Sequence, residues 1–324
     1  MSCTSSSKSS TESGSGGAII AARHGERLDY ILRDSGSNWI PTTSRPWDPP
    51  LTEYGQKTQT VELGKRIARQ LKEKGLPKVS AVYSSPLLRC CQTSMGAIIG
   101  LQQEGGVKED EKLQIRMEHG LIESSCEKWY TSWGLPSSDS TWGYRPPIEP
   151  IEEETVHPMA KVAVQKLLLS PTEMQEKLTT GEEEGKHDDI VDTTYASIHT
   201  LNPYGWNNFE TRKLQLARME KMSALLAAKH PNETILLVAH GSPVTHLYEV
   251  ITGKSWREHG VSAYASFSIY GHCYKEEEEK KIVDDEAVAE MMGGEEKQLS
   301  WTEVEINNSA HKLDESSTEF KSGR

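Results

Sequence analysis

Residues 18–26, Ala-Ile-Ile-Ala-Ala-Arg-His-Gly-Glu, place five apolar residues directly before a charged motif. A short apolar run bounded by polar residues is typical of a buried strand. The motif Arg23-His24-Gly25 therefore lies where a strand ends. In open α/β sheets ligands bind beyond the carboxyl ends of the strands, so this motif is a candidate site.

Three further predicted strands end in the same way. The first is followed by a turn and a helix with an arginine in its first turn, the second by a glutamate and the third by a histidine. The three strands, each given with the residue that follows it, are 79–83 with Arg89, 113–116 with Glu118, and 234–239 with His240. If these strands are parallel neighbours, the four groups converge at one edge of the sheet.

Helical patterns lie between these strands, which predicts an α/β fold with a mostly parallel central sheet and helices on both faces. One helix follows Thr52, a candidate N-cap, and ends at Gly75. The others cover about 87–99, 209–230 and 244–251, with a weaker pattern in 152–180. Residues 262–270 and 300–306 read as two late strands, arranged as a hairpin around a long acidic loop.

The 324 residues fit a single domain over 18–307, with disordered segments at 1–17 and 308–324. The net charge of −12 is concentrated in two acidic insertions, near 149–189 and 275–298. The first holds 11 acids and 4 lysines, and residues 275–300 hold 10 acids and 4 lysines, so the remainder is nearly neutral. This distribution argues against nucleic acid as a partner.

The sequence also indicates the cellular setting. No apolar run approaches the roughly 20 residues of a membrane span, and the N-terminus has no apolar core of a secretory signal. The five cysteines are an odd number at irregular spacing, which favours a reducing compartment. We therefore expect a cytoplasmic protein that does not bind membranes.

The residues at the four strand ends suit a phosphoryl group. Guanidinium matches phosphate oxygens as a bidentate donor, and a neutral imidazole is a competent nucleophile near neutral pH. A carboxylic acid can protonate the leaving oxygen. Glu118 is the candidate for that proton, although Glu123, five residues further on, could serve instead.

Other phosphate and hydrolase chemistries lack their motifs. None of the cysteines at 90, 91 and 126 is followed by an arginine at the spacing of a cysteine phosphatase. Tyr248 stands where a Walker P-loop needs glycine before Gly253-Lys254-Ser255. The sequence contains neither Gly-x-Ser-x-Gly nor His-Glu-x-x-His.

At these strand ends the sequence resembles the histidine phosphatase, or phosphoglycerate-mutase-like, superfamily. The matching strings are Arg23-His24-Gly25-Glu26, Tyr83 to Thr93 (YSSPLLRCCQT), and Val238-Ala239-His240-Gly241. The resemblance covers about residues 18–272. It implies a phosphorylated nucleophile at His24, phosphate ligands at Arg23, Arg89 and His240, and no metal or other cofactor.

Within the superfamily the sequence is most similar to the phosphatase domain of UBASH3/STS-type proteins and ecdysteroid-phosphate phosphatases. The strings that carry this are Arg23 to Arg27 (RHGER), Arg116 to Glu123 (RMEHGLIE), and Val191 to Tyr195 (VDTTY). The resemblance implies a further pocket arginine at Arg27 and the acid at Glu118. Gly25 and Tyr195 are expected to contact the substrate. This sequence has His119 where family members often have proline, so the resemblance does not identify the substrate.

Three functions follow. The first is a metal-independent phosphomonoester hydrolase with a phosphohistidine on His24. The second is a phosphoglycerate-mutase-type isomerase, which the sequence after Arg27 disfavours. The third is a catalytically inactive scaffold that binds phosphorylated ligands. The substrate is a phosphorylated small molecule or a phosphoprotein, and a homodimer is left open.

Overall fold

A computed structural model describes residues 16–37, 45, 48–108, 111–123, 168–180, 189–199, 210–258, 260–276 and 297–309. The expected disordered segments, 1–17 and 308–324, lie almost wholly outside these ranges, and so does most of both acidic insertions. Among the described helices, none has the length and apolar character that crossing a membrane requires.

The centre of the fold is a six-stranded sheet in the order β3-β2-β4-β1-β5-β6. Neighbours among the first four strands run parallel, whereas β5 is antiparallel to both β1 and β6. The strands are β1 (Gly17–Arg23), β2 (Val79–Ser84), β3 (Ile115–Met117), β4 (Thr234–Ala239), β5 (Phe267–Glu276) and β6 (Lys297–Asn308). The mostly parallel sheet predicted from the sequence is confirmed, and so is the late hairpin.

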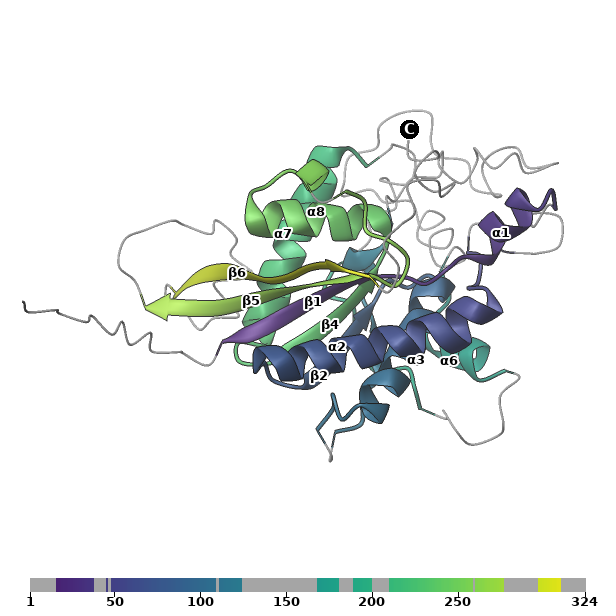
Figure 1. Ribbon diagram of the computed structural model, residues 1–324, viewed down its shortest axis with the longest axis horizontal. Helices are drawn as coiled ribbons and strands as arrows, with labels where there is room; N and C mark the ends of the chain where they lie inside the picture. The colour runs from purple at the N-terminus through teal and green to yellow at the C-terminus, as the bar shows by residue number, and fades with distance from the viewer. Residues whose placement is uncertain are drawn as a thin grey trace, which may run out of the picture.

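Helices cover both faces of this sheet, as predicted (Figure 1). On one face lie α7 (Arg212–Lys229) and α8 (Gly241–Thr252). On the other lie α2 (Thr60–Lys74), α3 (Leu88–Gln103) and α6 (Pro171–Thr179). The short α1 (Leu28–Asp34) follows β1. Two buried clusters result, because successive side chains of β1, β2 and β4 point to opposite faces.

Local sequence explains how α2 begins and ends. The Thr52 hydroxyl accepts a hydrogen bond from the Gly55 amide at 2.9 Å, as an N-cap does, and a π-helical turn (Gly55–Gln59) leads into α2. Gly75 ends the helix with φ of +66°. Gly64 of α2 and Gly100 of α3 let the two backbones approach so closely that a Cβ at either position would overlap the facing helix.

Several elements begin a few residues away from their predicted starts, and α8 and β5 show why. Helix α8 begins at Gly241 rather than Val244, because Pro243 is tolerated in the first turn of a helix. Strand β5 begins at Phe267 rather than Ser262. The preceding backbone turns instead, with Ala265 at φ of +50° and its amide donating to the carbonyl of His24 at 3.1 Å.

Candidate active site

His24 lies directly beyond β1 and is 2% exposed. Its amide donates to the carbonyl of Ala239 at 3.0 Å, which holds it beside the end of β4. Its Nδ1 lies 2.8 Å from the carbonyl oxygen of Gly25, and a carbonyl only accepts hydrogen bonds. Nδ1 therefore carries the proton of the neutral ring, and Nε2 keeps its lone pair.

Gly25 orients the histidine through its backbone. Its amide donates to the Thr93 hydroxyl at 3.0 Å and its carbonyl accepts from His24, so the residue orients the histidine. A Cβ at Gly25 would lie 3.1 Å from side-chain atoms of Gln59 and Thr60. A side chain at this position would therefore crowd both residues, and the expected contact of Gly25 with the substrate stays a prediction.

Arg89 is fully buried in the first turn of α3. Its Nη2 donates to Nδ1 of His240 at 3.2 Å. Its Nε and Nη1 have no hydrogen-bond partner among the described residues, and the Asp48 carboxylate lies 4.0 Å from Nη1. A buried guanidinium with two unused donors is prepared to bind an anion.

Asp48 is a site residue that the sequence does not reveal. Its carboxylate is buried and accepts the Leu88 amide at 2.8 Å, so it fixes the first turn of α3. It lies 40 positions before Leu88, in a segment with no regular pattern, so only the folded structure brings the two together.

His240 follows β4 and is fully buried. Its ring centroid lies 5.3 Å from that of His24, with the planes at 64°. Besides Arg89, it contacts the hydroxyl of Ser85, 2.8 Å from Nε2. The structure thus brings together His24, His240 and Arg89, as the strand ends predict.

Two further arginines complete the cluster. Arg23 donates to the Ser262 carbonyl at 2.6 Å and stacks on the Tyr264 ring at 4.5 Å. Buried Arg27 binds both carboxylate oxygens of Asp29, at 3.0 and 2.7 Å. Besides burial and Arg89, the positive charges of Arg23 and Arg27 also lower the pKa of His24. Both arginines therefore lie near His24, with Tyr264 beside Arg23 and Asp29 beside Arg27.

The electrostatics of the cluster keep both histidines neutral. Burial lowers the pKa of His24 well below 6.5, and the charge of Arg89 lowers it further. Burial and Arg89 also lower the pKa of His240 well below 6.5. An uncharged His24 with a free Nε2 lone pair is the form that attacks an electrophile.

These buried histidines predict that stability depends on pH. Burial also lowers the pKa of His272 to about 4. In the unfolded chain each histidine titrates near 6.5, so below that pH the unfolded state binds protons that the folded state does not. We expect the free energy of unfolding to fall between pH 7 and 5, with each such histidine contributing up to about 1.4 kcal/mol per pH unit. Urea unfolding at several pH values measures this, and constant or rising stability towards pH 5 would contradict it.

Glu118 lies beyond β3 as expected and is fully buried, but its carboxylate is already occupied. It accepts five hydrogen bonds from a turn next to it and from the segment 195–199. The donors are the Gly120 amide (2.9 Å), the Ser197 hydroxyl (2.7 Å) and the His199 amide (3.1 Å) on Oε1, and the Tyr195 hydroxyl (2.7 Å) and the Ile198 amide (2.9 Å) on Oε2. These contacts tie the Glu118 carboxylate to segment 195–199, and the acid role of Glu118 stays a prediction.

Tyr195 lies beside Glu118. Its hydroxyl binds Glu118, and its ring packs edge-on against Tyr83 with 5.7 Å between centroids. Both groups therefore help to hold the segment 195–199 in place, and the expected contact of Tyr195 with the substrate stays a prediction. Glu123, the alternative acid, lies half-buried just beyond the turn 119–121, whose neighbouring carbonyls of Gly120 and Ile122 are held by Arg218. Burial raises the pKa of Cys90, a residue that contacts His240, and the charge of Glu123 adds a smaller increase.

Glu118→Gln should therefore destabilise the fold. An amide group has one acceptor oxygen, and its NH₂ would face backbone amides that only donate. We expect the free energy of unfolding to fall by about 2–3 kcal/mol, measured by urea denaturation. Glu53→Gln, on an exposed helix side chain, is the control and should change it by less than about 0.5 kcal/mol. Equal small changes in both variants would show that the five hydrogen bonds contribute little.

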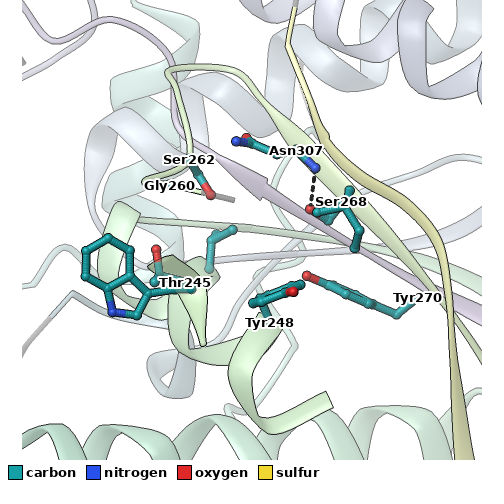
Figure 2. Close-up of a pocket in the computed structure, with 10 residues that line it drawn as sticks. Thr245, Tyr248, Gly260, Ser262, Ser268, Tyr270 and Asn307 are labelled. Carbon is teal, nitrogen blue, oxygen red and sulfur yellow. Dashed lines mark hydrogen bonds between the residues drawn. The ribbon is translucent and has the colours of Figure 1, made fainter. Parts of the chain in front are cut away.

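A separate pocket lies between α8 and the β5–β6 hairpin (Figure 2). It encloses about 270 Å³, including the part open to solvent, and its described lining residues carry no charge. Thr245, Tyr248, Tyr270 and Ser262 line it, and the carbonyl of Ser262 accepts a hydrogen bond from Arg23. An uncharged lining gives no attraction for a phosphate dianion, so the candidate active site is the arginine–histidine cluster.

The curated proteins that match this chain include two ubiquitin-associated and SH3 domain-containing proteins. No family model matches the chain. The chain is 31% identical over 136 residues to ubiquitin-associated and SH3 domain-containing protein B of Mus musculus, and 29% identical over 137 residues to protein A of that species. These stretches are 37% and 35% of this chain but only 20% of each relative. This similarity confirms the resemblance to STS-type proteins indicated by the motifs.

Solved structures also match over most of the chain. The ecdysone phosphate phosphatase from Bombix mori, in complex with tungstate, has a TM-score of 0.47 at 16% identity, covering 92% of this chain and 98% of its own. A mycobacterial glucosyl-3-phosphoglycerate phosphatase has a TM-score of 0.43 at 17% identity, covering 91% and 100%. A phosphoglycerate mutase from Bacillus anthracis has a TM-score of 0.38 at 17% identity, covering 86% and 98%.

Proposed function

We propose that this protein hydrolyses phosphate monoesters through a phosphohistidine on His24 and is a member of the histidine phosphatase superfamily. One observation carries the proposal: a neutral His24 with a free Nε2 lone pair lies among Arg23, Arg27 and Arg89. Two donors of Arg89 have no partner among the described residues. A nucleophile beside unused anion-binding groups fits transfer of a phosphoryl group.

The reaction has two balanced steps. In the first, Nε2 of His24 attacks phosphorus, the ester P–O bond breaks, and the leaving oxygen takes a proton from a carboxylic acid. In the second, water attacks the phosphohistidine, the P–N bond breaks, and the carboxylate takes the proton from water. The Gly25 carbonyl supports both steps, because it holds Nδ1–H while positive charge develops on the ring.

The charge of the pocket also suits a phosphate monoester. Three arginines face two histidines that are neutral, and buried carboxylates offset part of the positive charge: Asp29 at Arg27 and Asp48 at Arg89. The pocket keeps a net positive charge without substrate, while the carboxylates limit repulsion among the guanidinium groups.

The proton for the leaving group has two candidate sources. Five hydrogen bonds hold Glu118 as an acceptor, and this favours Glu123. The Arg218 side chain, which also binds Glu210 at 2.7 Å, fixes the turn that precedes Glu123. We therefore propose Glu123 as the acid and Glu118 as the residue that anchors segment 195–199.

Leaving-group dependence separates the two carboxyl groups. We expect Glu123→Gln to slow hydrolysis of an alkyl phosphate by about 100-fold, and hydrolysis of p-nitrophenyl phosphate much less, since nitrophenolate barely needs a proton. Glu118→Gln should slow both substrates by the same factor. A selective loss on the alkyl phosphate in Glu118→Gln, with Glu123→Gln unaffected, would return the acid role to Glu118.

The proposed function is tested by measuring phosphate release by the full chain from a panel of phosphomonoesters. The panel includes phosphotyrosine peptides, sugar phosphates, nucleotides and a steroid phosphate, since one structural neighbour is named an ecdysone phosphate phosphatase. We expect turnover that does not depend on 2,3-bisphosphoglycerate. Strong dependence on the bisphosphate with poor hydrolysis would identify a mutase, and phosphate binding without turnover of any ester would identify an inactive scaffold.

A further inference from the structure

Ser85, the first residue beyond β2, contacts the second histidine of the site. The side chain is fully buried, and its hydroxyl oxygen lies 2.8 Å from Nε2 of His240. Its neighbour Ser84 is equally buried, but the Ser84 hydroxyl donates to the carbonyl of Ser85 at 2.9 Å. Two adjacent serines in the same surroundings therefore differ in whether they touch His240.

The donors and acceptors around His240 fix its protonated nitrogen. A guanidinium group only donates hydrogen bonds, so Nδ1, 3.2 Å from Nη2 of Arg89, must carry a lone pair. The ring is neutral because burial and Arg89 lower its pKa well below 6.5. Its single proton therefore lies on Nε2, and it is donated to the hydroxyl of Ser85.

This arrangement leaves the neutral His240 no N–H for a phosphoryl oxygen. A direct hydrogen bond from His240 to the phosphate, which the sequence leads one to expect, would need a second ring proton. In this state the ring accepts a hydrogen bond from Nη2 of Arg89 and so orients the guanidinium. The Nε and Nη1 groups of that guanidinium have no hydrogen-bond partner among the described residues.

We propose that Ser85 is a positioning residue: by accepting Nε2–H it holds His240 in one tautomer and one orientation, and His240 in turn aims Arg89 at the phosphate. The proposal rests on the function proposed above, because that function requires the Arg89 guanidinium to bind a phosphoryl group. A Cys90 sulfur 3.4 Å from Nε2 is the other group within reach, and a thiol is a much weaker acceptor than a hydroxyl.

Nitrogen-15 NMR of the histidine rings tests the first part without any assay of activity. In the full-length, phosphate-free protein, we expect His240 to show a protonated Nε2 and a bare Nδ1, with His240→Gln used to assign the signals. Ser85→Ala should broaden these signals or shift them towards the other tautomer. Ser84→Ala, the matched control, should leave them unchanged.

Binding of orthovanadate, a phosphate analogue, tests the second part. We expect Ser85→Ala to weaken vanadate binding about tenfold, and to raise KM for p-nitrophenyl phosphate by a similar factor, because Arg89 is no longer held. Ser84→Ala should change both by less than about twofold. Equal effects of the two variants on vanadate binding would overturn the proposal.

The NMR result also separates this inference from the proposed function. A protonated Nδ1 on His240 of the unaltered protein overturns the inference even if Ser85→Ala does not fold. A protein that hydrolyses no phosphomonoester, yet shows Nε2–H on His240 and vanadate binding that depends on Ser85, would refute hydrolysis and leave the positioning role standing.

Discussion

Replacing His24 by alanine should reduce kcat for any phosphomonoester substrate by roughly a thousandfold or more. His24 is the residue whose ring combines a free Nε2 lone pair with the nearby charges of three arginines, and alanine leaves phosphorus with no nucleophile. Steady-state hydrolysis of p-nitrophenyl phosphate measures the loss, and thermal unfolding checks that the variant is folded.

His246→Asn is the control for this change. His246 is another buried histidine, on α8, and the charges that act on its pKa belong to Glu249, Arg212, Arg218 and Glu210 and not to the three pocket arginines. We expect its replacement to change kcat by no more than about twofold. If a folded His24→Ala variant kept the activity of the unaltered protein, His24 would not be the nucleophile.

Arg89→Lys should have the second-largest effect, about 100- to 1,000-fold on kcat/KM. Lysine keeps the charge but loses the planar fork, so it cannot bind His240 and a phosphate together in the present geometry. Its ammonium group would also lie in a fully buried position. The measurement is kcat/KM together with the inhibition constant of inorganic phosphate, which should rise.

Arg69→Lys provides the comparison, because Arg69 lies on the surface and pairs with Glu62 and Glu104. It should leave kcat/KM and phosphate inhibition within about twofold of the unaltered protein. A loss of similar size in both variants would mean that a general property of the protein, and not the Arg89 fork, had changed.

The sequence predicts the sheet well because local patterns determine its strands. The apolar runs before His24 and His240 mark β1 and β4 to within a residue or two at either end. The parallel strands then bring His24, His240 and Arg89 to one edge, so the core of the candidate site follows from the order of the chain.

The partners of those residues could not be predicted in the same way. Asp48 and Ser85 reach the site through contacts between residues 40 and 155 positions apart. Asp48 lies in no distinctive motif, and the motif that contains Ser85 does not show which group its hydroxyl contacts. Glu118 shows the opposite difficulty. Its position after β3 predicts a catalytic acid, but the segment 195–199 returns to it across some 80 residues and occupies both oxygens. A carboxyl group's function depends on such partners, which local patterns do not encode.

Detection of the phosphorylated residue during turnover tests the central claim most directly. The full chain is mixed with p-nitrophenyl phosphate, quenched under alkaline conditions that preserve phosphohistidine, and mapped by mass spectrometry of its peptides. We predict one phosphoryl group on His24, labile to acid and absent from His24→Ala. A phosphoryl group on any other residue, or rapid turnover with no phosphorylated enzyme at any quench time, would contradict the account.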